Sequence, residues 1–180
     1  IMVMFLPQST YADVSIATLN VRSMHPLAAS SVIPIATSPN MQQKTADILT
    51  ALQEHDPTVG VLTETRTCAA LASHMRSTLW TARYRSWVIP SPDDQCAGVT
   101  VFWRPDKVQV QGEKVIVPGR AGRCKVTFKA DGTSMWLHAV YMHANEEGMT
   151  GDQSPVARLI QAVTASVQSH SNSCVVGDLN

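Results

Sequence analysis

The alternation of strand-like and helix-like patterns limits this chain to few folds. Residues 13–20, "DVSIATLN", alternate between the two faces of a strand and end in a polar residue. A helical pattern over residues 40–55 follows, with Asn40 as its cap, and then a short apolar strand pattern over residues 58–64. A second amphipathic helical pattern covers residues 68–79. Strand–helix–strand units of this kind predict a layered α/β domain.

The second half of the chain changes to strand-like segments separated by turn-rich pieces. A last helix begins near Ser154 and Pro155, where proline suits a first turn, and the strand pattern "SCVVGD" follows it. Antiparallel-looking strands combined with strand–helix–strand units predict a mixed sheet. With 180 residues the chain is long enough for one domain, or most of one. The strand-like segments cover residues 84–89, 98–103, 107–117, 123–129 and 135–142.

The charged residues are unevenly distributed, although 14 basic and 14 acidic side chains sum to zero. Residues 66–85 contain four arginines and no acid, and residues 104–125 contain six basic residues against two acids. Residues 131–180 contain five acids and one base. A basic middle with an acidic end suits a polyanion held beside a metal-binding pocket. Ordinary solvated faces explain the same pattern equally well.

The cysteine spacing and the first residues indicate the cellular compartment of the protein. The four cysteines lie far apart with no CxxC pair, which argues against a zinc knuckle or a dense disulfide framework. This usage favours a reducing, intracellular compartment. The histidines in the predicted loops and helices lack metal-ligand spacing, so zinc is not indicated. The start "IMVMFLP" is far too short to span a bilayer and has no signal-peptide pattern, so we expect no membrane partner.

Polar residues follow four of the strand-like segments at the point where each one ends. A hard divalent cation such as Mg²⁺ binds a few oxygen ligands and keeps several waters, so one glutamate and an amide oxygen can hold it. A second carboxylate can orient or deprotonate an attacking water, and asparagine and tyrosine can donate to a phosphate. Alone, a strand-end glutamate is usually solvated and a Gly-Asp pair is usually a turn. The residues concerned are Asn20, Glu64, Tyr141, Asn145, Asp178 and Asn180.

Four short motifs carry a resemblance that covers the chain from Val14 onward. In their order they resemble the endonuclease/exonuclease/phosphatase superfamily, which has the DNase I-like fold, and "GVTVFW" resembles the central strand of that family. The pairing of "LNVRS" with "ETR" is most similar to the endonuclease domain of non-LTR retrotransposons. The resemblance implies a four-layered α/β sandwich with mixed, largely antiparallel sheets. The motifs are "TLNVRS" (18–23), "LTETR" (62–66), "AVYMHAN" (139–145) and "VVGDLN" (175–180).

The resemblance also implies a role for each matching residue. Glu64 would be the main metal ligand, assisted by Asn20, and the metal would be Mg²⁺ or Mn²⁺. Tyr141 would contact the phosphate or set the hydrogen bonds of the site. Asp178 would align or activate the nucleophilic water.

Further residues stand beside these positions. Asn180 would orient the phosphate, and Asn145 matches the end of a family strand and would line the same pocket. Arg22 and Arg66 adjoin motif residues and could contact the nucleic-acid backbone, although surface charge explains each of them more simply. A long connection rich in Pro, Ser and Ala covers residues 23–40. We interpret it either as a DNA-contacting element or, more simply, as an insertion that decorates the fold without a role in binding.

The family pattern also contains a segment that we do not find in the sequence. In the family, further strands follow the "GDLN" motif and end in an aspartate–histidine pair. Because this segment is not found, we expect the domain over residues 13–180 to lack its C-terminal part and to be inactive alone. Residues 1–12 are expected to be an N-terminal extension. His143 is interpreted as a loop residue, and His138 as a strand residue that packs or faces solvent, so neither is expected to replace the family histidine.

Three functions stay open on the sequence. The first is a magnesium-dependent endonuclease that nicks DNA, with RNA or another phosphoester as the alternative substrate, and with a nuclear location if it serves a retrotransposon. The second is a catalytically inactive half-domain that acts as a structural or interaction subunit and is completed by a partner chain. The third is a phosphatase of the same fold.

Four large aromatic residues invite the idea of base stacking. Core packing is nevertheless our prediction for each of them. They are Trp80, Trp87, Phe102 and Trp103.

Overall fold

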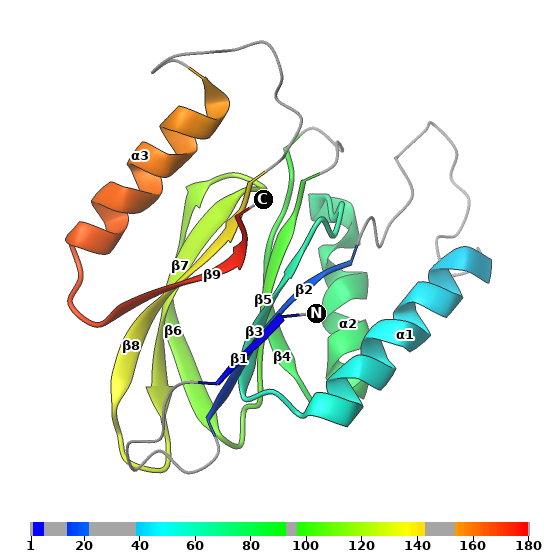
Figure 1. Cartoon of the computed structure of the whole chain (residues 1–180). Coiled ribbons are helices and arrows are strands. Elements are labelled where there is room, and N and C mark those ends of the chain that lie inside the picture. Colours follow the sequence, from blue (N-terminus) through cyan, green and yellow to red (C-terminus); the bar gives the residue numbers. More distant parts are fainter. Residues whose placement is uncertain (1, 6–13, 22–38, 93–96, 143–153, 180) are drawn as a thin grey trace.

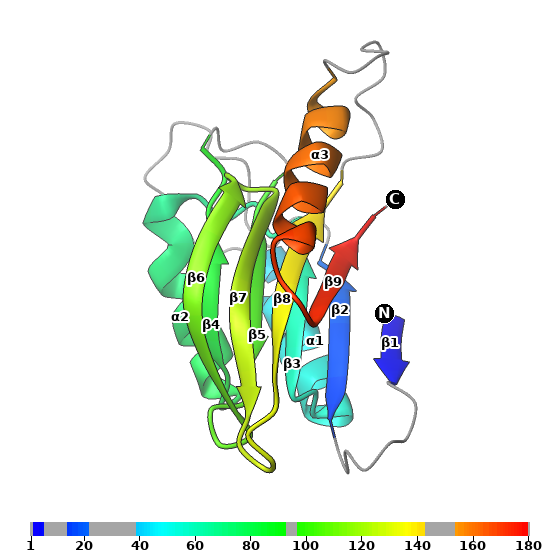
Figure 2. The same ribbon diagram turned by 90° about the vertical axis from the view of Figure 1, so that its left-hand side faces the viewer.

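The computed structural model describes residues 2–5, 14–21, 39–92, 97–142 and 154–179. Within these residues, nine strands form two sheets that pack face to face, and helices cover the outer face of each sheet (Figure 1). The order of the layers is helix, sheet, sheet, helix, and the perpendicular view in Figure 2 shows the same arrangement. The predicted α/β class, the four layers and the mixed sheets are therefore confirmed.

One sheet has five described strands in the order β1-β2-β3-β5-β4, and the other has four in the order β6-β7-β8-β9. Strands β2 and β3 are parallel, as are β8 and β9, and all other neighbours are antiparallel. Strand β1 falls in the stretch that the sequence assigns to an extension, and it pairs with β2. The strands are β1 (Met2–Phe5), β2 (Ser15–Asn20), β3 (Val59–Thr63), β4 (Arg85–Ile89), β5 (Val99–Trp103), β6 (Val108–Val117), β7 (Ala121–Phe128), β8 (Ser134–Tyr141) and β9 (Ser173–Asp178).

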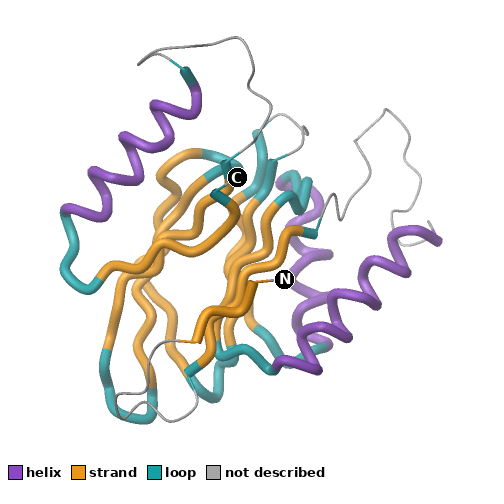
Figure 3. Tube along the Cα trace, in the orientation of Figure 1, coloured by secondary structure: helices purple, strands orange, loops and turns teal. Residues whose placement is uncertain are grey.

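Helices α1 (Pro39–His55) and α2 (Ala72–Thr81), with the short 3₁₀ helix η2 (Ala69–Leu71), cover the five-stranded sheet (Figure 3). Helix α3 (Pro155–Gln168) covers the four-stranded sheet, and its N-cap Ser154 accepts a hydrogen bond from the Ala157 amide at 3.0 Å. The prediction of Asn40 as a cap is wrong, because α1 already includes Pro39. Proline has a fixed φ and no N–H to satisfy, so it suits this first turn. None of the described helices is long and apolar enough to cross a membrane.

Strands β3 and β5 are buried along their whole length. One face of these strands packs against the other sheet through residues such as Val61 and Val101, and the opposite face packs under α1 and α2 through Leu62 and Phe102. This double burial explains the continuous apolar patterns in the sequence. Gly60 is required here because an added Cβ would lie 2.4 Å from the Phe102 ring and 2.6 Å from the Ala17 carbonyl oxygen. The central strands therefore fix the spacing between sheet and helices.

The prediction of core packing is wrong for one of the four aromatic residues. Phe102 and Trp103 are buried, and Trp87 packs partly buried against the core between the sheets. Trp80 is 60% exposed. It follows the fully buried Leu79 on α2, and one residue is a rotation of about 100° around a helix, which carries Trp80 away from the buried face.

A buried polar network helps to hold α3 against the four-stranded sheet. His138 of β8 has no exposed surface, and its Nε2 lies 3.1 Å from the Ser166 hydroxyl of α3. Arg123 of β7 donates from Nη1 to the same hydroxyl at 3.3 Å and lies 3.0 Å from Nδ1 of His170. Of the two placements expected for His138, packing is therefore the one that occurs.

The buried His138 predicts a loss of stability at acid pH. Burial lowers the pKa of His138 below its ordinary value of 6.5, and the neighbouring His170 and Arg123 lower it further. As the pH falls, the unfolded chain takes up this proton before the folded chain does. The part of the unfolding free energy that depends on neutral His138 is therefore fully present above about pH 6.5. It is lost as the pH falls further, with a slope of at most about 1.4 kcal/mol per pH unit. Urea unfolding at about pH 7.5 and about pH 5.5 should show a larger loss for the wild type than for His138→Gln, and equal losses would contradict this account.

Candidate active site

The two parallel strand pairs deliver the motif residues to one end of the sandwich. In the five-stranded sheet, Asn20 at the end of β2 lies opposite Thr63 at the end of β3, and Glu64 follows directly. In the four-stranded sheet, Tyr141 at the end of β8 lies opposite Asp178 at the end of β9. Strands β2 and β9 run side by side in Figure 2, so the ends of the two pairs meet across the interface between the sheets.

Two hydrogen bonds join these strand ends from one sheet to the other. The Asn20 amide donates from Nδ2 to Oδ2 of Asp178 at 2.7 Å. The Tyr141 hydroxyl donates to Oε1 of Glu64 at 2.9 Å. Four residues that the sequence singles out for catalysis and metal binding are therefore brought together, two from each sheet.

Tyr141 is held in its protonated form. The side chain is 1% exposed, and burial together with the carboxylate of Glu64 raises its pKa far above the ordinary value of 10.0. The Arg120 guanidinium lies over the ring, 5.2 Å from its centroid, and opposes this shift without cancelling it. Tyr141 therefore acts as a hydrogen-bond donor to Glu64 at neutral pH.

Arg120 is a member of the site that the sequence counts only as part of a basic stretch. It ends the turn between β6 and β7, and its carbonyl oxygen accepts a hydrogen bond from the Tyr141 amide at 2.8 Å. Its backbone and its side chain therefore both contact Tyr141. The turn residues "PGR" before β7 are the signal in the sequence, but that signal does not say which strand end the arginine will meet.

The turn after β3 sets the direction of the Glu64 side chain. Glu64 and Arg66 have φ values of 55° and 50°, a left-handed conformation that non-glycine residues adopt only when their surroundings impose it. The Thr65 amide donates to the Gly98 carbonyl at 3.2 Å, and Gly98 itself has a φ of 118°. A Cβ on Gly98 would lie 2.5 Å from the Thr65 hydroxyl and 3.0 Å from the Thr67 nitrogen. Gly98 therefore makes room for the turn that carries Glu64.

The other predicted residues are not all described. Arg66 lies on the turn two residues after Glu64, and its side chain is partly buried. Asn145, Asn180 and Arg22 lie outside the described residues, as do His143 and most of the connection over residues 23–40. Their roles stay predictions.

The oxygen atoms at this site fit a hard divalent cation. Two carboxylates, Glu64 and Asp178, and the amide of Asn20 lie at the joined strand ends, and Mg²⁺ prefers carboxylate and amide oxygens together with waters. Among the described residues, no group of three or more His, Cys, Asp or Glu side chains gathers as a metal cluster. The donors from Glu64, Asp178 and Asn20 are all oxygen atoms, the ligand type that suits Mg²⁺ or Mn²⁺.

The close approach of β9 to β8 predicts that Gly177 cannot be replaced. Gly177 has a φ of 148°, and a Cβ at this position would lie 1.8 Å from the carbonyl oxygen of Val140. Gly177→Ala should therefore separate the strands beside Asp178 and cost about 2 kcal/mol or more in unfolding free energy, measured by urea titration.

Gly132→Ala provides a matched control for this substitution. Gly132 also has a positive φ, 73°, but a Cβ there would meet nothing within 4 Å. The unfolding free energy that Gly132→Ala loses should be limited to the backbone strain of a left-handed alanine, about 1 kcal/mol. If the two variants lose the same stability, the close strand contact at Gly177 is not what the glycine serves.

Comparison with proteins of known structure identifies the fold. No protein-family model matches the sequence, and no curated protein sequence matches it. Solved structures match over more than nine tenths of the chain, and they include members of the endonuclease/exonuclease/phosphatase family. The chain thus has the DNase I-like fold, as predicted. The sequence identities are low, so these matches establish the fold alone.

Three of these solved structures illustrate the range of proteins that share the fold. TDP2 from D. rerio, complexed with a single-strand DNA product, is 15% identical with a TM-score of 0.61, and the match covers 91% of this chain and 58% of that one. The mannosyl-6-phosphatase Bt3783 of Bacteroides thetaiotaomicron is 16% identical with a TM-score of 0.62, over 92% and 65% of the two chains. An AP endonuclease from Archaeoglobus fulgidus is 14% identical with a TM-score of 0.62, over 92% and 57%. The chain therefore spans less than two thirds of the length of these solved chains.

Proposed function

We propose that the protein is a magnesium-dependent phosphoester hydrolase, and specifically an endonuclease that cuts DNA by attack of water on a phosphodiester. The observation that carries the proposal is the pair of hydrogen bonds that joins Glu64 to Tyr141 and Asn20 to Asp178. It assembles two carboxylates, an amide and a protonated tyrosine at one end of a DNase I-like fold. These are the groups that phosphoester hydrolysis with a hard cation requires.

Each residue has a part in the proposed reaction. Glu64 and the amide oxygen of Asn20 would hold Mg²⁺ or Mn²⁺, and the cation when bound supplies positive charge to the phosphoryl oxygen. Tyr141 fixes the Glu64 carboxylate through its hydroxyl. Asp178 orients the attacking water and accepts its proton, and the Asn20 amide nitrogen fixes the Asp178 carboxylate for this task.

DNA is the proposed substrate on two grounds. The motif pair "LNVRS" and "ETR" resembles endonucleases of non-LTR retrotransposons, which would place the protein in the nucleus. Among the structural neighbours, one is an AP endonuclease and another was solved with single-strand DNA. Asn180 and Asn145 would then orient the phosphate, and Arg22 and Arg66 would contact the backbone.

A phosphatase is the second candidate, because the mannosyl-6-phosphatase Bt3783 shares the fold to the same extent. The described part of the site contains groups that handle a phosphate, and these groups do not select a base. Hydrolysis of a phosphomonoester without cleavage of DNA would favour this candidate. Absence of both activities in the full-length protein would instead favour the non-catalytic subunit that a partner chain completes.

Removal of the Glu64 carboxylate should abolish activity without unfolding the protein. In a plasmid-nicking assay with Mg²⁺, we expect Glu64→Gln and Asp178→Asn each to reduce the rate by at least about 100-fold, and EDTA to stop the wild type. Glu54→Gln is the matched control, because Glu54 is an exposed glutamate on α1. Circular dichroism should show the same fold in all variants. A Glu64→Gln protein that nicks DNA at the wild-type rate would overturn the metal assignment.

Loss of the Tyr141 hydroxyl should weaken cation binding as well as the rate. Tyr141→Phe keeps the buried ring but removes the donor to Glu64. We expect a rate reduction of roughly 10-fold and a higher Mg²⁺ concentration at half-maximal rate, because the carboxylate is no longer held in one orientation. An unchanged Mg²⁺ dependence would show that Tyr141 acts on the phosphate and does not position Glu64.

A further inference from the structure

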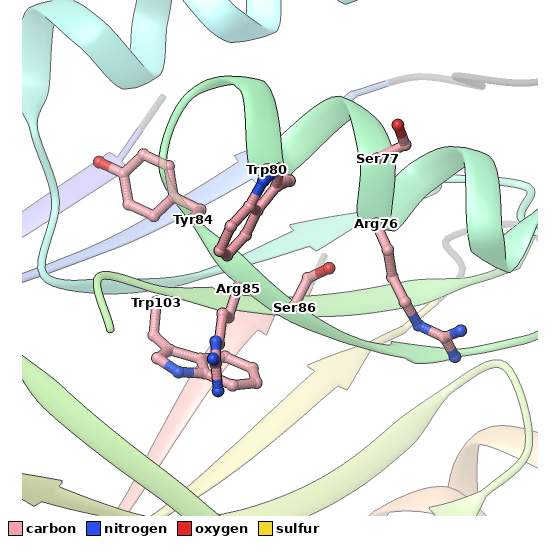
Figure 4. A pocket seen from close by; sticks show the side chains of 7 residues that line it. All are labelled: Arg76, Ser77, Trp80, Tyr84, Arg85, Ser86 and Trp103. Atoms are coloured by element: carbon pink, nitrogen blue, oxygen red, sulfur yellow. The ribbon is translucent and has the colours of Figure 1, made fainter. Parts of the chain in front are cut away.

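A second candidate site lies on the far end of the five-stranded sheet, and we refer to it as the Trp80 pocket (Figure 4). It is a cavity of about 380 Å³ between α2 and the edge strand β4. Arg85 pairs in register with Trp103, and Trp103 pairs with Val59 at the start of β3, whereas Glu64 follows the end of β3. The pocket is therefore separate from the candidate active site. Its lining residues are Arg76, Ser77, Trp80, Tyr84, Arg85, Ser86 and Trp103.

The aromatic part of the pocket is open to solvent. Trp80 hangs from α2 above strand β4 and is 60% exposed, the largest exposure among the exposed apolar side chains of the described residues (Figure 4). An indole that is left in water forgoes the stabilisation that burial would give. Trp103 forms the floor of the pocket and is 8% exposed. The pocket therefore presents an accessible indole face above an apolar floor.

Three polar side chains of the pocket lack partners within the described part of the chain. Neither Arg76 nor Arg85 makes an ion pair or a hydrogen bond there, and the buried hydroxyl of Ser86 has no hydrogen-bond partner. The sequence has no acidic residue from residue 65 to residue 92, so this basic stretch is not neutralised locally. Two guanidinium groups without partners among the described residues line the same pocket as an exposed indole, and this combination predicts a ligand that is both anionic and aromatic.

We propose that the Trp80 pocket binds single-stranded nucleic acid, with one unpaired base stacked on Trp80 and the adjoining phosphates on Arg76 and Arg85. This inference rests on the proposed function, since it gives a nuclease a second contact with its substrate. Aromatic faces that hold bases and basic side chains that follow the backbone are the usual means of binding single strands. The volume of the pocket is at the lower end of the range for small-ligand sites, about 300–1,000 Å³, and suits one base with its sugar.

The place of the pocket favours an unpaired strand over a duplex. Strand β4 is the last strand of the five-stranded sheet in the described part of the chain, so no further described strand covers its outer side. A base within a duplex is already stacked on its neighbours and has no free face for Trp80. The DNA would therefore engage the pocket through a single-stranded end, gap or flap.

The test is fluorescence anisotropy of a labelled oligothymidylate, titrated with the full-length protein in EDTA so that no cleavage occurs. We expect Trp80→Ala to weaken binding at least about fivefold, the lower end of what one stacked base contributes. Arg76→Gln and Arg85→Gln should each reduce the slope of log K against log salt by about 0.7, because each removes one phosphate contact to a single strand. Arg83→Gln is the control, since Arg83 belongs to the same basic stretch and does not line the pocket.

The result separates this proposal from the proposed function. Glu64→Gln should keep the Trp80-dependent binding even though it loses hydrolysis, so a failure of catalysis alone leaves the pocket assignment intact. Binding that is unchanged in Trp80→Ala and in the Arg76→Gln, Arg85→Gln double variant would overturn the assignment. Displacement of the oligonucleotide by an acidic aromatic peptide of equal affinity would also overturn it and would assign the pocket to a protein ligand.

Discussion

The Tyr141–Glu64 and Asn20–Asp178 hydrogen bonds cross from one sheet to the other at the same end of the sandwich. Each bond joins a carboxylate on one sheet to a donor on the opposite sheet, so each bond forms only when both sheets are in place. The apolar core sets the distance between the sheets, and the parallel pairs set the register within them. The candidate site thus depends on the packing of the whole domain, and changes in that packing, as at Gly177, should alter it.

Much of this arrangement could be predicted from the sequence because it follows strand ends. A strand places its terminal residue at the end of a sheet, and the order of the motifs indicates which strand ends lie together. The sequence therefore predicts the grouping of Asn20, Glu64, Tyr141 and Asp178. Contacts that depend on turns were not visible. Neither the reach of Arg120 over the Tyr141 ring nor the space that Gly98 leaves for the Glu64 turn has a periodic signal.

The error at Trp80 has a different cause. A helical pattern identifies a buried stripe, but a large apolar residue just outside that stripe is exposed however hydrophobic it is. The residues around the exposed side chain then indicate what it can bind. In α2 and β4 those neighbours are two arginines without partners in the described part of the chain, and this combination gives the exposed indole a proposed ligand. Arg76 and Arg85 of the basic stretch line one pocket with Trp80, although nothing in the sequence indicated that these residues meet.

The central claim is that the joined strand ends bind a divalent cation through Glu64. Crystals of the full-length protein soaked in Mn²⁺ would test it most directly, because manganese is located by its anomalous scattering. We predict one strong peak at coordination distance, roughly 2 Å, from the Glu64 carboxylate, and no peak there in Glu64→Gln. A peak elsewhere with the Glu64 carboxylate unoccupied, or a peak that persists in Glu64→Gln, would contradict the account.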